Sequence, residues 1–128
     1  LMTDDPIAAA LRQGGIIDIT TTGRSSGQPR RIEIVFFHVD GRVYITGTPG
    51  TRAWLANLKA DPSMTFHLKR GLSADLSASA RIVTDEAERR AVATAACTAW
   101  NRPGQIEDFV AGSPVIEVVF EDPSLLTA

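Results

Sequence analysis

Cysteine is nearly absent from this 128-residue chain, since Cys97 is the only one. One cysteine cannot close an internal disulfide, which excludes a disulfide-stabilised scaffold. Aromatic residues are also scarce at 6% of the chain, too few for a surface that stacks nucleic-acid bases. No apolar run approaches the ~20 residues of a membrane-spanning helix, and the first residues lack the basic start and apolar core of a signal peptide. We therefore expect a cytoplasmic protein with no nucleic-acid partner and no membrane span.

Side chains that commonly carry catalysis or bind metals are equally sparse. The two histidines, His38 and His67, lie 29 residues apart, and neither has a second histidine or a cysteine at ligand spacing. His67 falls on the polar face of an alternating segment and is expected to face solvent, whereas Cys97 is expected to be a small buried residue. No G-x-S-x-G nucleophile motif occurs. We predict no catalytic side chain and no metal site, so an enzyme built this way would depend on a cofactor.

The chain does contain a normal supply of core residues, arranged with the period of β-strands. Hydrophobic residues make up 44% and charged residues 22%, which is typical of a globular protein. The length fits one domain spanning residues 1–128. Apolar and polar residues alternate through residues 72–82, the pattern of a half-exposed antiparallel strand. Asp40-Gly41 is a strong signal for a tight hairpin turn, because both residues accept positive φ.

These patterns predict a mainly β protein with short α-helices. Six antiparallel strands in a small domain tend to close into a barrel, because closure removes exposed edges. Residues 34–37 are apolar on both faces, which predicts that both sides of their strand are covered, as where two barrels pack into a dimer. The expected strands are residues 16–22, 30–39, 42–46, 64–68, 72–82 and 115–120, and the expected helices are residues 7–11, 51–60, 84–100 and 105–110.

Two loops have the composition of anion-binding sites. The first, residues 23–31, holds Arg24, Arg30 and Arg31 among small residues. Backbone N–H groups, hydroxyls and guanidinium groups together suit a phosphate or a carboxylate. The second loop, residues 47–52, leads into a helix with Thr51 as its expected N-cap and Arg52 as its first helical residue. A helix N-terminus attracts anions, so two loops meeting in the fold would grip one anionic ligand from two sides.

The charge distribution supports this interpretation. The formal net charge is only −2, but the basic residues are not spread evenly. Residues 19–60, which include both loops, contain six Lys or Arg and two acidic residues. We therefore expect a basic pocket in a protein that is acidic elsewhere.

Three stretches of the chain resemble a known family. Residues 20–30, Thr-Thr-Thr-Gly-Arg-Ser-Ser-Gly-Gln-Pro-Arg, resemble the T-T-G-R-x-S-G-x-x-R opening of the deazaflavin (F420)-dependent nitroreductase-like proteins. Residues 40–46 and 52–62, which include an Asn-Leu-x-x-Asp-Pro segment, are similar to the same family and to the wider pyridoxamine-phosphate-oxidase-like split-barrel flavoproteins. The resemblance runs from about Ile16 to Val83.

The resemblance implies a six-stranded antiparallel split β-barrel, usually a homodimer, that holds coenzyme F420 in a groove beside its central sheet. The reaction would be hydride transfer between the reduced deazaflavin and a small-molecule substrate such as an enone, a quinone or a nitro compound. By position in the motifs, Arg24 and Arg30 would hold the phosphate and acidic tail, residues 32–35 would lie along the ring, and Trp54 would lie near the ring or the substrate. The other implied cofactor-binding residues are Ser26, Gly27, Gln28, Pro29, Arg31, Ile32, Ile34, Thr48, Gly50, Thr51 and Arg52.

The chain departs from the family pattern at three places. Family members often have lysine where this chain has Ser25, a second lysine in the turn at residues 47–50, and an Asn/Thr-Pro pair where this chain has Ile32-Glu33. Arg31 and Arg52 are candidates to replace the two cations. Alternation along the strand predicts that Glu33 shares the face of Arg31, opposite Arg30. FMN carries one phosphate and needs fewer cations, so an FMN-binding split-barrel oxidoreductase is an alternative. A non-catalytic split barrel that binds a flavin, haem or another small molecule is a second alternative.

Overall fold

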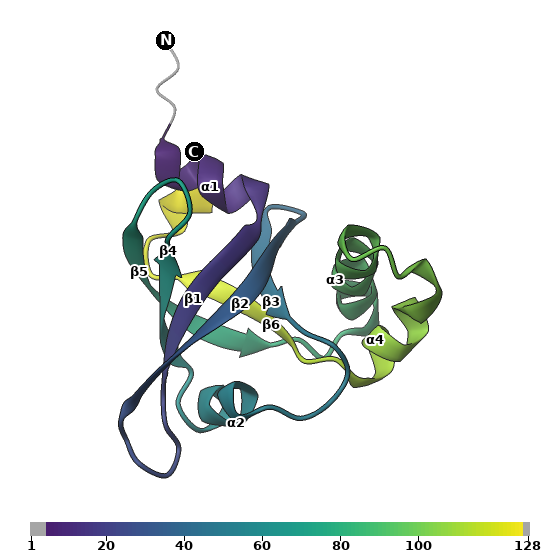
Figure 1. Cartoon of the computed structure of the whole chain (residues 1–128), viewed down its shortest axis with the longest axis horizontal. Coiled ribbons are helices and arrows are strands. Elements are labelled where there is room, and N and C mark those ends of the chain that lie inside the picture. The colour runs from purple at the N-terminus through teal and green to yellow at the C-terminus, as the bar shows by residue number, and fades with distance from the viewer. Residues whose placement is uncertain (1–4, 127–128) are drawn as a thin grey trace.

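Six antiparallel strands form a closed barrel in the computed structural model, which describes residues 5–126 (Figure 1). Around the barrel the order is β1-β2-β3-β6-β5-β4. This confirms the expected fold class, and the strand bounds lie close to those expected; β5 begins two residues late. The strands are β1 (Gly15–Thr22), β2 (Pro29–Val39), β3 (Arg42–Thr46), β4 (Ser63–Leu68), β5 (Ala74–Ile82) and β6 (Val115–Phe120).

Strand β2 is the longest strand and has two different neighbours. It pairs with β1 along eight residues, from Gly15↔Phe36 to Thr22↔Pro29. Its pairing with β3 covers only the end of the strand, from Phe36↔Ile45 to Val39↔Arg42. The turn between β2 and β3 is Asp40-Gly41, with φ of 52° and 77°, as a tight hairpin requires. Residues 29–35 of β2 therefore extend past β3 and split the barrel at this point.

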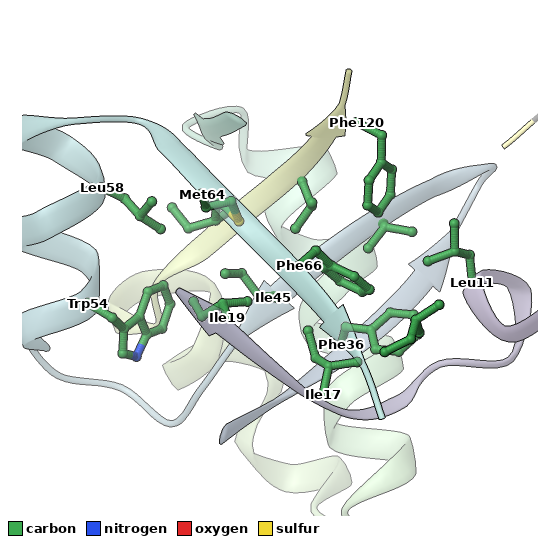
Figure 2. Close-up of a cluster of buried hydrophobic side chains, with 14 residues drawn as sticks. Leu11, Ile17, Ile19, Phe36, Ile45, Trp54, Leu58, Met64, Phe66 and Phe120 are labelled. Carbon is green, nitrogen blue, oxygen red and sulfur yellow. The ribbon is translucent and has the colours of Figure 1, made fainter. Parts of the chain in front are cut away.

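Two short helices close the ends of the barrel (Figure 1). α1 (Pro6–Gln13) begins at Asp5, whose carboxylate accepts a hydrogen bond of 2.9 Å from the backbone N–H of Ile7. It buries Leu11 at one end of the core, and α2 (Ala53–Ala60) buries Trp54 and Leu58 at the other end (Figure 2). The short helix η2 (Pro123–Leu126) lies beside α1.

The start of α2 differs from the expectation. The N-cap is Arg52, with an extended backbone (φ −146°, ψ 147°), and it makes no capping hydrogen bond through its side chain. Thr51 therefore lies outside the helix and is exposed. The prediction of Thr51 as N-cap was wrong, because the loop turns into the helix one residue later.

The barrel interior is filled by buried side chains from five of the strands (Figure 2), and partly buried apolar side chains of β5 pack against them. Phe66 is completely buried, and its ring makes edge-to-face contacts with Phe36 and with Phe120, each at 5.2 Å between ring centroids. Such pairs stabilise a core beyond the area they bury. The other buried members of this cluster are Leu11, Ile17, Ile19, Val43, Ile45, Trp54, Leu58, Met64, Leu68, Ile116 and Val118.

A helical layer covers part of the outside of the barrel. It consists of α3 (Glu86–Ala99), the turn η1 (Pro103–Gln105) and α4 (Ile106–Gly112). Phe37, on the outer side of β2, contacts Trp100 at 5.7 Å between ring centroids, and Trp100 contacts Phe109 at the same distance. The apolar outer face of β2 is thus covered in part by the chain itself. Cys97 is fully buried in this layer, and burial raises the pKa of its thiol, as expected for an unreactive cysteine.

A polar cluster joins this helical layer to the barrel. Tyr44 in β3 is buried and donates a hydrogen bond of 2.6 Å to the carboxylate of Glu88 in α3. Arg81 in β5 bridges Glu88 and Glu117, with its Nε 2.6 Å from Glu117 Oε1. These contacts give the outer helix layer a fixed attachment to three strands.

We expect Phe66→Ala to destabilise the fold by about 3–5 kcal/mol, because truncating a buried aromatic leaves a cavity in a packed core. Val119, which is 42% exposed, supplies the control, since Val119→Ala should change stability by no more than about 0.5 kcal/mol. Chemical denaturation of both variants measures the difference. Equal effects of the two substitutions would contradict this description of the core.

The alkaline titration of Tyr44 gives a second prediction. Burial raises the pKa of Tyr44 to about 12, and the hydrogen bond to Glu88 acts in the same direction. The folded state therefore favours the neutral phenol, and this stabilisation is present below about pH 10, the unfolded pKa, and is lost as the pH rises toward 12. Because the chain has one tyrosine, tyrosinate absorbance reports this group alone. A midpoint near 10 in the folded protein would contradict the buried hydrogen bond.

Candidate functional site

A groove of about 560 Å³ opens where β2 extends past β3. We call it the split groove. One wall comes from the β1–β2 loop and the first half of β2, and the other comes from the first turns of α2. A volume of this size is typical of a site for a small molecule or cofactor. The lining residues are Thr21, Gly23, Arg24, Ser25, Ser26, Arg30, Ile32, Glu33, Arg52, Ala53, Trp54 and Asn57.

The β1–β2 loop is held in shape by its small residues. Gly23 and Gln28 are bridged by a backbone hydrogen bond of 2.8 Å, and Ser26 Oγ accepts a bond of 3.1 Å from the N–H of Gln28. A Cβ on Gly23 would lie 2.5 Å from that hydroxyl, so any larger residue here would displace the Ser26 side chain. Ser26 Oγ also accepts a hydrogen bond of 3.3 Å from Arg30 Nη2. Gly23 and Ser26 therefore fix the position of the Arg30 side chain.

Arg24 is fixed from the other wall of the groove. Asn57 in α2 is 4% exposed, and its Oδ1 accepts two hydrogen bonds of 3.1 Å, one from the backbone N–H of Arg24 and one from Arg24 Nη1. Asn57 Nδ2 donates to Thr21 Oγ1 at 3.3 Å. These contacts connect the β1–β2 loop to the helix that faces it.

Arg52 closes the loop before α2. Its guanidinium donates to the carbonyl of Gly50 at 3.1 Å and to Thr48 Oγ1 at 2.8 Å. The same group lies over Gly47, where a Cβ would come within 2.9 Å of Arg52 Nη2. Thr48 and Gly50 therefore act on the groove through Arg52, which itself lines it.

The electrostatics of the split groove favour an anion. Arg24, Arg30 and Arg52 all line it, and among residues 5–126 no carboxylate forms an ion pair with any of them. The first turn of α2 adds the positive end of a helix dipole. Ile32 and Trp54 supply apolar surface beside the three cations. The first loop singled out in the sequence and Arg52 of the second loop thus meet around one groove.

Arg31 lies on the opposite face of β2 from Arg30. Its Nε is 2.9 Å from Asp18 Oδ2, in an ion pair on the outside of the barrel. Lys69 continues this pairing, 2.7 Å from Asp18 and 2.5 Å from Glu33. The expectation that Glu33 shares the face of Arg31 is confirmed, although Glu33 also reaches the rim of the groove.

The remaining expected cofactor residues lie around the groove and not in its lining. Gly27 and Pro29 line a second groove on the outer side of β1, β4 and β5. Gly50 and Thr51 line a third groove, between α2 and the β5–α3 connection. Gln28 is exposed in the β1–β2 loop, and Ile34 packs against the barrel core.

The prediction that His67 faces solvent was wrong. His67 is 6% exposed, with Nε2 2.7 Å from Thr20 Oγ1 and Nδ1 2.7 Å from Asp75 Oδ1. The hydrogen bond to His67 lowers the pKa of Asp75. Polar side chains from the two neighbouring strands cover the ring, which alternation within one strand does not reveal. The three residues link β1, β4 and β5 on the outer face, whereas Thr21 faces the split groove.

Sequence reasoning gave no role to Asn57, although it lies within a recognised motif. One signal was available: Asn57 is three residues after Trp54 and next to Leu58, so it shares the apolar face of a helix. A polar residue on a buried helix face needs a hydrogen-bond partner. The partner, Arg24, comes from a loop 33 residues earlier.

From the sequence we expect no metal site and no membrane-spanning helix. Within residues 5–126 no three His, Cys, Asp or Glu side chains are grouped so that they could hold a metal ion. In the same residues, no helix combines the length and the apolar character needed to cross a membrane.

Comparisons with known proteins agree with this fold. The sequence model of the family described as F420H(2)-dependent quinone reductase matches residues 3–104. Among solved structures, the conserved hypothetical protein Rv2991 of Mycobacterium tuberculosis is 17% identical with a TM-score of 0.78, covering 100% of this chain and 89% of that one.

Two further structures share the fold at similar identity. A candidate pyridoxamine 5′-phosphate oxidase of Listeria innocua is 17% identical with a TM-score of 0.71, covering 91% of both chains. A FAD-binding protein of Mesorhizobium loti is 16% identical with a TM-score of 0.65, covering 94% of this chain and 91% of that one. The solved structures establish the split-barrel fold, and the family match covers most of the sequence. The chain therefore belongs to the F420H(2)-dependent quinone reductase family.

Proposed function

We propose that the split groove binds coenzyme F420 and that the protein transfers a hydride between the reduced deazaflavin and a small organic electrophile, such as a quinone, an enone or a nitro compound. The observation that carries this proposal is the meeting of three arginines, none paired with a carboxylate in the described chain, beside an apolar wall. Family membership supports an F420-dependent oxidoreductase.

The groove suits the two chemical parts of such a cofactor. Arg24 and Arg30 would hold the phosphate, and Arg52 and the first turn of α2 would hold the acidic tail. Ile32 and Trp54 would lie against the ring. Guanidinium groups bind phosphate and carboxylate oxygens in pairs, so three of them match a ligand with several anionic groups. Of the two arginines expected to compensate for the missing family lysines, Arg31 lies outside the groove and Arg52 would take this role.

The chain itself would bind and orient the cofactor and the substrate and shield them from water. When bound, the reduced deazaflavin supplies the hydride from its ring carbon. Among the described residues the groove is lined by three arginines and Glu33 but by no histidine, cysteine, lysine or tyrosine, the other side chains that commonly transfer protons. Rate enhancement would therefore come from holding the two reactants in line and from excluding water with Ile32 and Trp54.

A second candidate is an oxidoreductase that uses FMN. The FAD-binding relative from Mesorhizobium loti shows that this fold accommodates a flavin, and the arginines of the groove also suit a single phosphate. A non-catalytic protein that binds a flavin or another small molecule is the third candidate.

The physiological substrate, a homodimeric state and a cytoplasmic location stay predictions.

Ligand titration followed by Trp54 fluorescence tests the proposed function. A Trp100→Phe background leaves Trp54 as the only tryptophan, and oxidised F420 and FMN are added separately. We expect F420 to quench Trp54 with micromolar affinity and to bind at least tenfold more tightly than FMN. Tighter binding of FMN would favour the second candidate, and absence of binding by both would contradict an oxidoreductase of either kind.

Neighbouring arginines on opposite faces of β2 provide a matched pair of variants. Arg30→Ala should raise the Kd for F420 about tenfold or more, since a charge-assisted hydrogen bond is lost. Arg31→Ala should change it by less than about twofold, because Arg31 points to the outer face. Equal losses in the two variants would show that the anion lies elsewhere than in the split groove.

A further inference from the structure

Asn57 lies in the α2 wall of the split groove and contacts the opposite wall through a buried side chain. It is 4% exposed and lies in α2 between Trp54 and Leu58, which enter the barrel core. Its carboxamide makes three hydrogen bonds, two to Arg24 and one to Thr21. A buried amide with this many partners is held in a single orientation.

The direction of the amide follows from its partners. The backbone N–H and the guanidinium of Arg24 can only donate, so the atom that meets both must be the oxygen. The nitrogen is then left to donate to Thr21 Oγ1. One oxygen thus fixes the main chain and the side chain of the same arginine.

This arrangement affects how Arg24 meets a ligand. Arg24 is exposed and follows Gly23 in a loop, where a long side chain would otherwise sample many rotamers. Asn57 occupies one Nη of its guanidinium and leaves the other donors of the group for a ligand. A guanidinium held in this way can present two parallel donors to one phosphate or carboxylate.

We propose that Asn57 is a positioning residue: it orders Arg24 for an anionic ligand and thereby sets the preference of the groove for a phosphate-bearing cofactor over its phosphate-free core. This proposal rests on the proposed function for the identity of the cofactor. A purely structural role for Asn57, as a link between α2 and the loop, would affect both ligands equally.

A double-mutant cycle separates these roles. Arg24→Ala, Asn57→Ala and the double variant are titrated with oxidised F420 and with the corresponding deazariboflavin core, which lacks the phosphate and acidic tail. Asn57→Ala should raise the Kd for F420 about five- to tenfold and that for the deazariboflavin core less than twofold. In the Arg24→Ala background, Asn57→Ala should add less than twofold, because its effect acts through Arg24.

Thr46→Val is the control for a structural effect. It removes a buried hydrogen bond from Thr46 Oγ1 to the carbonyl of Pro114, and Thr46 does not line the split groove. We expect it to lower the melting temperature without changing the preference for F420 over the deazariboflavin core by more than twofold. Additive losses in the cycle, or equal losses for both ligands, would overturn the positioning role.

Two measurements remain decisive if F420 does not bind. Amide hydrogen exchange at Arg24 should become at least tenfold faster in Asn57→Ala, because that N–H loses its acceptor. The double-mutant cycle is then repeated with inorganic pyrophosphate, followed by the chemical shift of the Arg24 amide. Coupled losses with pyrophosphate would support the role of Asn57 while the proposed function fails. Unchanged exchange, or no pyrophosphate binding by the wild type, would overturn the role itself.

Discussion

The split groove depends on a mismatch in strand length. β2 has 11 residues, whereas its hairpin partner β3 has five. The first half of β2 therefore leaves the barrel wall with β1 as its neighbour, and its other edge faces the groove. Alternate backbone N–H and C=O groups of a strand with one neighbour point outward, so this edge offers donors and acceptors to a ligand. Its side chains on the inner face, Arg30 and Ile32, point into the same space.

Three residues of α2 convert this open edge into a defined site. Trp54 and Leu58 anchor the helix at the end of the barrel core (Figure 2). Asn57 connects it to the β1–β2 loop through hydrogen bonds to Arg24. Arg52, just before the helix, holds residues 47–50 in a closed turn. The position of the three arginines is thus a consequence of core packing. Three arginines give the groove positive charge, and under the proposed function the bound cofactor would supply the chemistry.

Much of this fold could be predicted from the sequence because its signals are local. Alternation marks β5, and Asp40-Gly41 places the β2–β3 turn. The alternation of side chains along a strand was enough to predict that Glu33 and Arg30 lie on opposite faces of β2. Contacts between strands were harder to foresee, since they depend on register. His67 looked solvent-facing within its own strand, but register puts Thr20 and Asp75 against its ring.

Only part of the candidate site could be predicted from the sequence, because some of its contacts join residues far apart in the chain. The loop motif identified Arg24 and Arg30, while the partner of Arg24 lies on a helix far along the chain. The basic charge of residues 19–60 also proved less concentrated than the sequence indicated. Arg31 pairs with Asp18, and Arg42 lies within 4 Å of Glu88 and Glu117, so neither contributes to the groove.

A crystal structure of the protein with oxidised F420 bound would test the central claim most directly. The account predicts the deazaflavin ring against Ile32 and Trp54, with the phosphate within hydrogen-bonding distance of Arg24 and Arg30. A cofactor bound in the second groove, against the hydroxyls of β4 and β5, would contradict it.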